Sequence, residues 1–228
     1  MLRVRPIHFT SRPEAWEPLL GALGMIKTVD DDDRREFDAG SGRLALHRVP
    51  AGSAEDATTV FGVEIGDPAE FARRTEADGT RAEVIDAPHG TTVRITAQDG
   101  FSFLADKAAH GAVCADADPA LAVVGIWLTP AVERSAQELR NIGARPRRET
   151  PDAADFSTKN GGILAVRPGP EAQGGGLEFE YDGGLDGLRE RLAGAGVPVR
   201  DEGGALLATT PDGGELVVRQ GPNPGTAS

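Results

Sequence analysis

The stretch that decides the fold reads Glu36-Phe37-Asp38-Ala39-Gly40-Ser41-Gly42-Arg43-Leu44-Ala45-Leu46-His47-Arg48. It predicts two short strands joined by a Gly/Ser turn. A matching stretch returns 119 residues later as Asp155-Phe156-Ser157-Thr158-Lys159-Asn160-Gly161-Gly162-Ile163-Leu164-Ala165-Val166-Arg167. The same offset aligns Ile7 with Ile126, Thr10 with Thr129 and Gly24 with Gly143. An internal repeat of this length predicts one module that is used twice.

The composition is typical of a globular protein with two small cores. The chain has 228 residues, of which 39% are hydrophobic, and this length accommodates two units of about 110 residues. Its formal net charge of -12 disfavours nucleic acid and anionic membranes as partners. No apolar run is long enough for a membrane span, and no signal peptide is recognisable, so we expect a cytoplasmic protein. Cys114 is the single cysteine, which excludes an intrachain disulfide and a cysteine-rich zinc site.

Turn and cap residues divide each half into elements. In the first half they predict a strand, a helix, three strands, a second helix and two to three closing strands. Ser11 and Glu14 are expected to form the capping box of the first helix, and Asp67 and Glu70 that of the second. The predicted domains are a first module over residues 1–106, a linker over 107–120, a second module over 121–219 and a flexible tail over 220–228.

Three motifs give the chain a resemblance to a known superfamily. They are the strand-to-helix opening Arg5-Pro6-Ile7-His8-Phe9-Thr10-Ser11-Arg12-Pro13, the hairpin Gly42-Arg43-Leu44-Ala45-Leu46, and the late Gln98-Asp99-Gly100-Phe101-Ser102-Phe103, echoed by Pro211-Asp212-Gly213. Together they resemble the vicinal oxygen chelate superfamily, which includes glyoxalase I, bleomycin-resistance proteins and extradiol dioxygenases. The resemblance implies an α+β fold: two tandem βαβββ modules pair into curled mixed sheets around a cleft, with helices on the outer faces. It also implies a divalent metal at the bottom of the cleft in the enzymes.

The metal-ligand positions that the resemblance implies carry unsuitable residues. In the family the ligands are His, Gln or Glu on the first and last strands of each module, and in some branches on the strand before the second helix. The corresponding positions in this chain are Arg5 and Val124, Val60 and Gly176 (to within about one residue), and Leu104 and Val217. Arginine stays protonated and the others offer no side-chain donor. We therefore expect no metal site of the family type and no cofactor.

Strand alternation predicts which side chains face the cleft, because successive residues point to opposite faces. The apolar residues of three strands should pack under the helices: Phe61, Val63 and Ile65, Leu177, Phe179 and Tyr181, and Leu44 and Leu46. The side chains expected at the cleft are Arg5, Ile7, Phe9, His47, Glu64, Glu178 and Glu180, with Leu104, Ile126, Leu128 and Leu164 as an apolar wall. A mostly apolar cavity with a few charges is typical of small-molecule sites.

Each candidate residue also has a purely structural interpretation. His47 is a candidate general base or lone metal ligand, or else a hydrogen-bonded histidine at a strand edge. Glu64, Glu178 and Glu180 are candidates for proton transfer or for a rebuilt metal site, or else lie on a solvated sheet face. Arg5 is a candidate for binding a carboxylate or enolate oxygen, or else for a salt bridge to Glu178 or Glu180.

Histidine 8 falls on the helix-facing side of its strand, and we expect it to be buried and hydrogen-bonded. The remaining histidines, His89 and His110, fall in a turn and in the linker, where we expect them at the surface.

Three functions are compatible with these residues. The first is a metal-free protein that binds a small organic molecule, as resemblance to the bleomycin-resistance branch implies. The second is a metal-dependent lyase, isomerase or dioxygenase that uses displaced ligands such as His47, Glu64 and Glu178. The third is a metal-independent enzyme in which Arg5 stabilises an oxyanion and His47 or a glutamate moves a proton. A monomer and a homodimer both fit the sequence.

Overall fold

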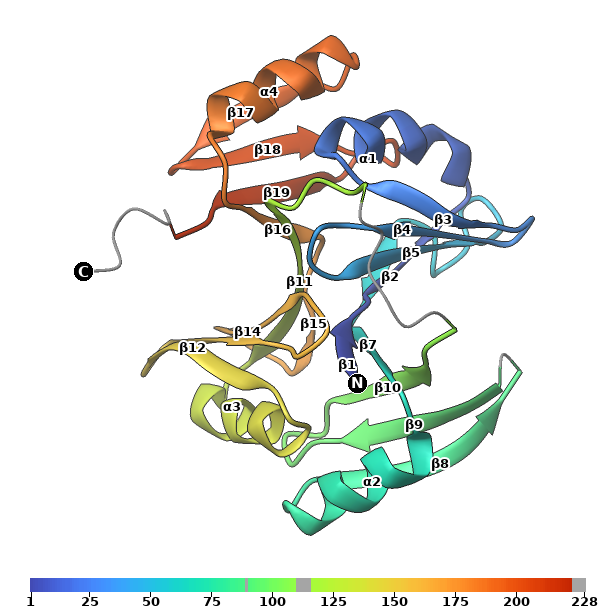
Figure 1. Cartoon of the computed structure of the whole chain (residues 1–228), viewed down its shortest axis with the longest axis vertical. Helices are drawn as coiled ribbons and strands as arrows, with labels where there is room; N and C mark the ends of the chain where they lie inside the picture. The colour runs from blue at the N-terminus through green and yellow to red at the C-terminus, as the bar shows by residue number, and fades with distance from the viewer. Residues whose placement is uncertain (89, 110–115, 223–228) are drawn as a thin grey trace. The chain divides into compact units, whose positions relative to one another are not determined.

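The computed structural model describes residues 1–88, 90–109 and 116–222 (Figure 1). His89, His110 and Cys114, which the sequence assigned to a turn and to the linker, lie outside these residues. The described part contains four α-helices and mixed sheets, so the α+β class is confirmed. None of its helices combines the length and apolar character that a membrane crossing requires.

The elements of the first half follow in chain order. They are β1 (Leu2–Val4), β2 (Ile7–Thr10), the 3-10 helix η1 (Pro13–Trp16), α1 (Glu17–Leu23), β3 (Ile26–Asp30), β4 (Arg34–Asp38), β5 (Arg43–Arg48), β6 (Thr58–Val60), β7 (Gly62–Ile65), α2 (Pro68–Ala77), β8 (Arg81–Ala87), β9 (Gly90–Thr96) and β10 (Ser102–Lys107). They form two five-stranded sheets, with the strand orders β1-β7-β10-β9-β8 and β3-β4-β5-β2-β6.

The second half repeats this order with one strand fewer, because the single strand β11 stands where the first half has β1 and β2. Its elements are β11 (Leu121–Thr129), α3 (Val132–Asn141), β12 (Arg145–Thr150), β13 (Ala153–Ser157), β14 (Ile163–Pro168), β15 (Gln173–Gly174), β16 (Glu178–Tyr181), α4 (Leu185–Gly194), β17 (Val199–Glu202), β18 (Ala205–Thr209) and β19 (Glu215–Gln220). The strands form a sheet of order β12-β13-β14-β11-β16-β19-β18-β17, and β15 pairs with β11.

The βαβββ order occurs four times, twice in each half. The four occurrences are β2-α1-β3-β4-β5, β7-α2-β8-β9-β10, β11-α3-β12-β13-β14 and β16-α4-β17-β18-β19. The first strand pairs in parallel with the last one in β2–β5, β7–β10 and β16–β19, and β11 neighbours β14 in its sheet. Each predicted repeat therefore contains two such motifs.

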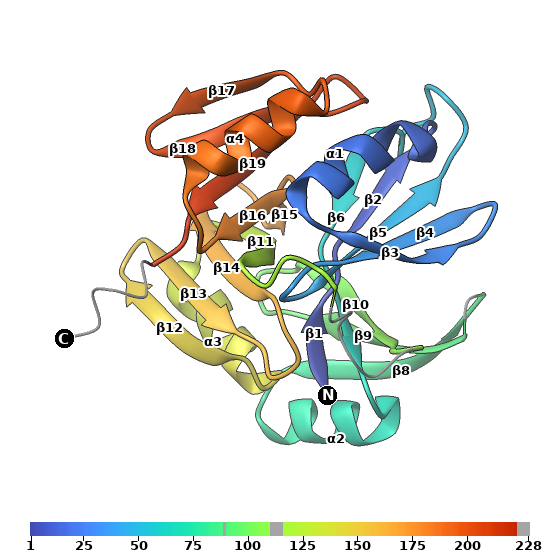
Figure 2. The same cartoon turned by 45° about the horizontal axis from the view of Figure 1, so that its top comes forward.

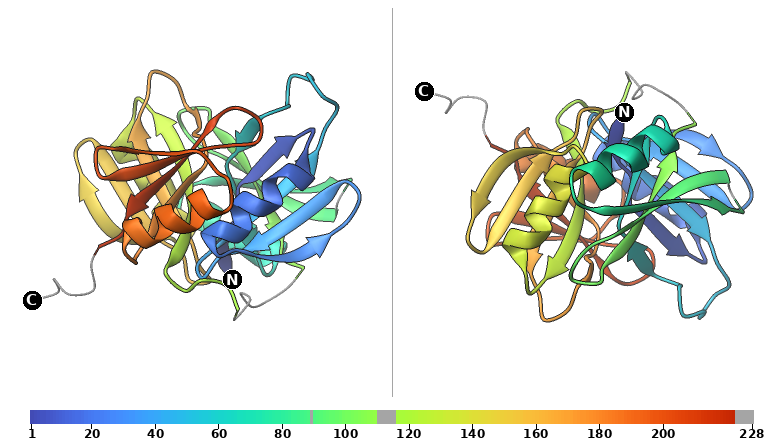
Figure 3. Two further views of the ribbon diagram at one scale, coloured as in Figure 1. Left: turned by 90° about the horizontal axis from the view of Figure 1, so that it is seen from above. Right: turned by 90° about the horizontal axis from the view of Figure 1, so that it is seen from below.

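Two compact units divide the chain differently from the repeat. Unit 1 contains Met1–Pro6, Val60–Ala112 and Gly125–Gly175, and unit 2 contains Ile7–Thr59, Val113–Val124 and Gly176–Ser228. Each unit thus combines one βαβββ motif of the first half with one of the second. In unit 1, α2 packs on β8 and β9 (Figure 3, right). In unit 2, α4 packs on β17 and β18 (Figure 2), and α1 lies beside α4 (Figure 3, left).

Of the two predicted helix caps, the one at α2 is confirmed and the one at α1 is wrong. Asp67 caps α2 by accepting a 3.0 Å hydrogen bond from the backbone N of Glu70, as expected. The capping box at Ser11 is wrong, because η1 precedes α1 and no side chain caps either helix. The Thr10 hydroxyl accepts from the Arg12 backbone N at 3.0 Å instead, which is a local turn that competes with helix capping.

The segments assigned to a linker and a tail are partly structured. The linker range 107–120 contains the last residue of β10, Lys107, and a described stretch over 116–120. In that stretch the backbone N of Asp118 donates to the carbonyl of Gly24 at 2.9 Å. At the other end, β19 extends to Gln220, and the Gly221 backbone N donates to Tyr181 O at 2.8 Å.

Candidate functional site

A row of polar side chains crosses the first sheet of unit 1. The register places Arg3 of β1 opposite Glu64 of β7, Glu64 opposite Asp106 of β10, and Asp106 opposite Thr92 of β9. Side chains at opposite positions lie on the same face of a sheet. The flanking Val63, Ala105 and Val93 point to the other face and are buried.

Arginine 5 joins this row through two carboxylates. Its Nε lies 3.2 Å from Glu64 Oε1, and its Nη2 lies 3.3 Å from Asp106 Oδ2. Arg3 donates from Nε to Glu64 Oε2 at 2.6 Å, and Thr92 Oγ1 donates to Asp106 Oδ1 at 2.7 Å. All five residues are at most 7% exposed. Two cations and two anions form a buried network with no net charge.

The ion-pair partners of Arg5 in this network differ from those predicted from the sequence. Arg5 was expected to bind a ligand anion or to pair with Glu178 or Glu180, and the structure gives it Glu64 and Asp106 within unit 1. Glu64 was considered as a residue of a solvated sheet face, but it is 2% exposed. Arg3, Thr92 and Asp106 were missed, although the alternation that selected Arg5 and Glu64 also selects them.

The apolar residues predicted for unit 1 do not share one environment. Ile126 and Leu128 of β11 lie under the connection to β16: an added Cβ at Gly175 would come 2.7 Å from Ile126, and one at Gly169 would come 2.9 Å from Leu128. Leu104 is half-buried. That these side chains form the wall of a cleft stays a prediction.

Leucine 164 requires a correction. It is fully buried and lies opposite Phe156 in the register of β13 and β14. It therefore lies on the same sheet face as Phe156 and not on an open wall. The turn between β13 and β14 holds five residues, 158–162, whereas the equivalent turn between β4 and β5 holds four, 39–42. One additional residue shifts the register, so that every later side chain changes face.

The remaining predicted residues lie in unit 2. Phe9 of β2 is opposite His47 of β5, both are half-buried, and their rings meet edge to face with centroids 5.7 Å apart. Ile7 is also half-buried. Glu178 of β16 is 7% exposed, and its Oε1 lies 3.0 Å from Nε of Arg219. Glu180, two residues further along, is half-buried. Because the eleven predicted residues divide between two units, a common ligand site for them stays a prediction.

A second polar cluster surrounds Asp212 in unit 2, and the sequence analysis did not find it. Asp212 Oδ2 accepts from Trp16 Nε1 at 2.9 Å and lies 3.0 Å from His8 Nε2, and its Oδ1 accepts from Thr10 Oγ1 at 2.9 Å. His8 Nδ1 lies 2.9 Å from Thr59 Oγ1. His8 is therefore buried and hydrogen-bonded at both nitrogens, which confirms its predicted structural role. The only sequence signal was the paired Asp-Gly turns at 99–100 and 212–213.

Similarity to known proteins is found among solved structures and not among sequences. No protein-family model matches the sequence, and no curated protein matches it. Among solved structures, homoprotocatechuate 2,3-dioxygenase from Arthrobacter globiformis superposes with a TM-score of 0.65 and 17% identity, over 96% of this chain and 78% of that chain. A catechol 2,3-dioxygenase gives 0.63 and 17%, over 100% and 91%. A Mn(II)-bound glyoxalase from Novosphingobium aromaticivorans gives 0.59 and 14%, over 96% and 80%.

This chain has the vicinal oxygen chelate fold. At identities of 14–17% the likeness establishes the fold, and a fold by itself does not fix an activity. The vicinal oxygen chelate fold accounts for the βαβββ order and for the parallel pairing of first and last strands. The chemistry must be argued from the residues at the site.

The residues present do not fit the metal centre of the vicinal oxygen chelate enzymes. The register shows that the middle-strand neighbours of Leu104 and Val217 are Gly62 and Glu178, two residues beyond the predicted Val60 and Gly176. The two sets of positions are therefore Arg5, Gly62 and Leu104 in unit 1, and Val124, Glu178 and Val217 in unit 2. Glu178 is the one carboxylate among them, and a divalent ion needs about three protein ligands.

A wider search for metal ligands leads to the same result. Over residues 1–88, 90–109 and 116–222, no group of three or more His, Cys, Asp or Glu side chains is arranged to hold a metal ion. The candidate site in unit 1 is a set of buried ion pairs that joins Arg3 and Arg5 to Glu64 and Asp106.

Acidification is expected to destabilise the Asp212 cluster. Burial lowers the pKa of His8 from its ordinary value of 6.5, and the hydrogen bond and charge of Asp212, with a smaller effect of Asp56, oppose this only in part. The folded state therefore prefers neutral His8, so this contribution to stability is complete above pH 6.5 and decreases as the pH falls through the lowered pKa. We expect the melting temperature of the wild type to fall more between pH 7.5 and 5.5 than that of His8→Gln, measured by differential scanning calorimetry. Equal decreases in both proteins would contradict the assignment.

Proposed function

We propose that this protein binds a small organic molecule without a metal centre of the type found in its superfamily. Ligand sequestration, as in drug or metabolite resistance, is the form of activity that requires no catalytic group. The observation that supports the proposal is that Arg5, which lies where the resemblance implies a metal ligand, is held by Glu64 and Asp106 at 3.2 and 3.3 Å. A guanidinium stays protonated and cannot coordinate a metal ion, so Arg5 offers no ligand at that position.

The fold neighbours support a small organic molecule as the ligand. One of them, the homoprotocatechuate 2,3-dioxygenase from Brevibacterium fuscum, is described in complex with 3,4-dihydroxyphenylacetate. The half-buried Phe9 and His47 pair in unit 2 offers an aromatic surface, since their rings meet edge to face. These observations favour an aromatic or otherwise planar ligand.

Metal analysis and ligand recovery test the proposal together. We expect the purified, untagged protein to contain far less than one mole of Zn, Fe, Mn, Ni or Co per chain, and EDTA to leave its melting temperature unchanged. A thermal-shift screen of aromatic acids, beginning with 3,4-dihydroxyphenylacetate, should identify stabilising compounds, and mass spectrometry should recover them unchanged. Phe9→Ala should weaken a compound that contacts the aromatic pair. Stoichiometric metal, or a compound of altered mass, would contradict the proposal.

The alternative is a metal-dependent dioxygenase, isomerase or lyase with displaced ligands. The neighbours favour it, because they include two kinds of extradiol dioxygenase and a Mn(II)-bound glyoxalase. Against it, Glu64 is paired with Arg3 and Arg5, and Glu178 with Arg219, so two proposed ligands already serve as ion-pair partners. Oxygen consumption with 3,4-dihydroxyphenylacetate after reconstitution with Fe(II) or Mn(II) would establish this alternative.

A further inference from the structure

A cavity of about 470 Å³ lies between α3 and the hairpin of β12 and β13 in unit 1. Figure 2 shows α3 lying along this part of the sheet, where it packs on β13 and β14. The volume is within the range of small-molecule pockets, about 300–1,000 Å³, and none of the residues predicted for the cleft lines the cavity. Its buried floor and its charged rim are formed by Val132, Ala136, Ala154, Glu133, Arg140 and Glu149.

The internal repeat places an arginine in the equivalent position of unit 2. At the offset of 119 residues, Ala154 corresponds to Arg35, and β4 and β13 begin and end at corresponding residues. The Arg35 side chain is only 12% exposed. Its guanidinium lies against three carboxylates, those of Asp30 at 2.8 Å, Glu14 at 3.1 Å and Glu17 at 3.4 Å. Unit 1 therefore has a methyl group beside a cavity where unit 2 has a guanidinium held by carboxylates.

Two of these three carboxylates need no further cation in unit 1. Glu17 corresponds to Ala136, so this carboxylate is absent. Asp30 corresponds to Glu149, which forms an ion pair with Arg140. The charge of Glu149 is therefore balanced within the chain.

The third carboxylate has lost both of the cations that bind its counterpart. Glu14, which corresponds to Glu133, is bound by Arg35 and by Arg48. Arg48 corresponds to Arg167, but the longer turn before β14 moves Arg167 to the opposite sheet face, where it binds another carboxylate at 2.6 Å. In the part of the chain that the structure describes, the Glu133 carboxylate has no hydrogen-bond or ion-pair partner. The rim of the cavity is thus one cation short of its counterpart in unit 2.

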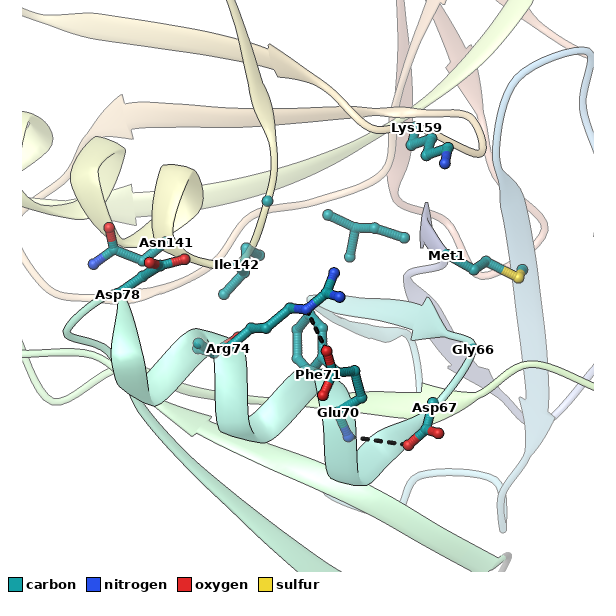
Figure 4. Close-up of a pocket in the computed structure, with 13 residues that line it drawn as sticks. Met1, Gly66, Asp67, Glu70, Phe71, Arg74, Asp78, Asn141, Ile142 and Lys159 are labelled. Carbon is teal, nitrogen blue, oxygen red and sulfur yellow. Dashed lines mark hydrogen bonds and ion pairs between the residues drawn. The ribbon is translucent and has the colours of Figure 1, made fainter.

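A second cavity of unit 1, beside α2, shows that such a space alone does not indicate a ligand. Figure 4 shows Arg74 reaching into it from α2, and Arg74 is already bound by Glu70 of the same helix. Asp67, which also lines it, caps that helix by accepting from the backbone N of Glu70. The cavity beside α3 differs because its carboxylate at Glu133 lacks the cations of the equivalent site.

We propose that the cavity beside α3 binds a small organic guanidinium ion, which takes the place of the Arg35 guanidinium in unit 2. The Glu133 carboxylate is its ionic partner, and its carbon atoms lie on the floor formed by Val132 and Ala154. A guanidinium suits this place because it is weakly hydrated and can form two parallel hydrogen bonds with a carboxylate. The site lies on different residues from those of the proposed function and does not depend on it.

N-Ethylguanidinium is the most direct probe, because it is the part of the Arg35 side chain that Ala154 lacks. We expect its titration into the full chain, followed by heteronuclear NMR, to shift the amide signals of Ala136 and Ala154 in a saturable way. Glu133→Gln removes the charge and keeps the shape, so it should weaken binding about fivefold or more. Glu76→Gln is the matched control, since Glu76 is an exposed helix glutamate of the same unit that does not line the cavity. It should leave the affinity within about twofold.

Two further measurements separate the charge from the space. N-Ethylurea has nearly the same shape without the charge, and we expect it to cause no saturable shift. Ala154→Arg supplies the guanidinium from the chain itself. It should abolish the binding of N-ethylguanidinium and raise the melting temperature, measured by differential scanning calorimetry.

Four results would each overturn the proposal. They are absence of saturable binding by N-ethylguanidinium, equal affinities of Glu133→Gln and Glu76→Gln, equal affinity for N-ethylurea, and unchanged binding or a lower melting temperature in Ala154→Arg. Phe9→Ala, which tests the proposed function in unit 2, should not change this affinity, so the two proposals fail independently.

Discussion

Glu64→Gln is expected to lower the free energy of unfolding by about 3–5 kcal/mol. Glu64 is 2% exposed, and it binds Arg3 through Oε2 and Arg5 through Oε1. The substitution keeps the side-chain volume but removes the negative charge between two buried guanidinium groups. Removing one partner of a buried ion pair is costly because the remaining charge has already lost its hydration.

Urea denaturation followed by circular dichroism would measure this loss. The matched control is Glu83→Gln in the same sheet, because Glu83 is about half exposed and its Oε2 lies 4.0 Å from Arg94 Nη1. We expect the control to change stability by less than about 1 kcal/mol, as is usual for surface pairs. A loss for Glu64→Gln as small as that of the control would show that water reaches the row and that the arginines are not buried cations.

The repeat and the main faces of the strands were predictable from sequence. Gly24 and Gly143 both follow a helix at positive φ, 91° and 93°, as their shared offset indicates. Phe37 and Phe156 are both buried. Alternation correctly placed Phe61, Val63 and Ile65 in the core. Short-range patterns succeed here because helix stops and strand faces depend on neighbouring residues.

The pairing register of the strands could not be predicted from the local sequence. A constant offset assigns Leu164 the wrong face, because Gly161 and Gly162 both adopt positive φ in a turn one residue longer than its counterpart. The middle-strand positions Val60 and Gly176 fell two residues short for a related reason. Strand ends are set by pairing partners far away in sequence, such as Leu104 for Gly62, and the local sequence does not contain that information.

The sequence also did not predict the hydrogen bonds between side chains of its two halves. The carboxylate of the first Asp-Gly turn, Asp99, accepts from Thr129 and Ser135 of the second half at 2.8 and 3.2 Å. The carboxylate of the second turn, Asp212, accepts from Thr10 and Trp16 of the first half. The repeat aligns Thr10 with Thr129 and Trp16 with Ser135. The compact units therefore combine segments from both halves, and a division of the sequence at residue 106 does not describe them.

Asp212→Ala is the second variant with a large expected effect, a loss of about 3 kcal/mol or more in the free energy of unfolding. It removes the acceptor for three donors at once: the Trp16 indole, the Thr10 hydroxyl and, in the tautomer with a proton on Nε2, His8. The side chains of His8 and Asp212 are only 6% and 5% exposed. Each buried donor left without an acceptor costs about 1–3 kcal/mol.

Two comparison variants separate this cluster from a general effect of losing an aspartate. Asp186→Ala removes a carboxylate that is 90% exposed, and it should change stability by less than about 0.5 kcal/mol. Asp99→Ala, the repeat equivalent in unit 1, should cost less than Asp212→Ala. Its side-chain partners Thr129 and Ser135 are hydroxyls that can rotate to other acceptors, whereas the indole of Trp16 donates along one fixed direction.

The urea unfolding transition of Asp212→Ala should show whether Asp212 holds the two ends of the chain together in unit 2. Asp212 lies near the end of the second half and holds Thr10 and Trp16 near the start of the first. If unit 2 forms only when both ends of the chain meet, Asp212→Ala should weaken the whole of unit 2, and Trp16 fluorescence should report a lower urea midpoint. Wild-type midpoint and slope in Asp212→Ala would show that the two ends are held together by apolar packing alone.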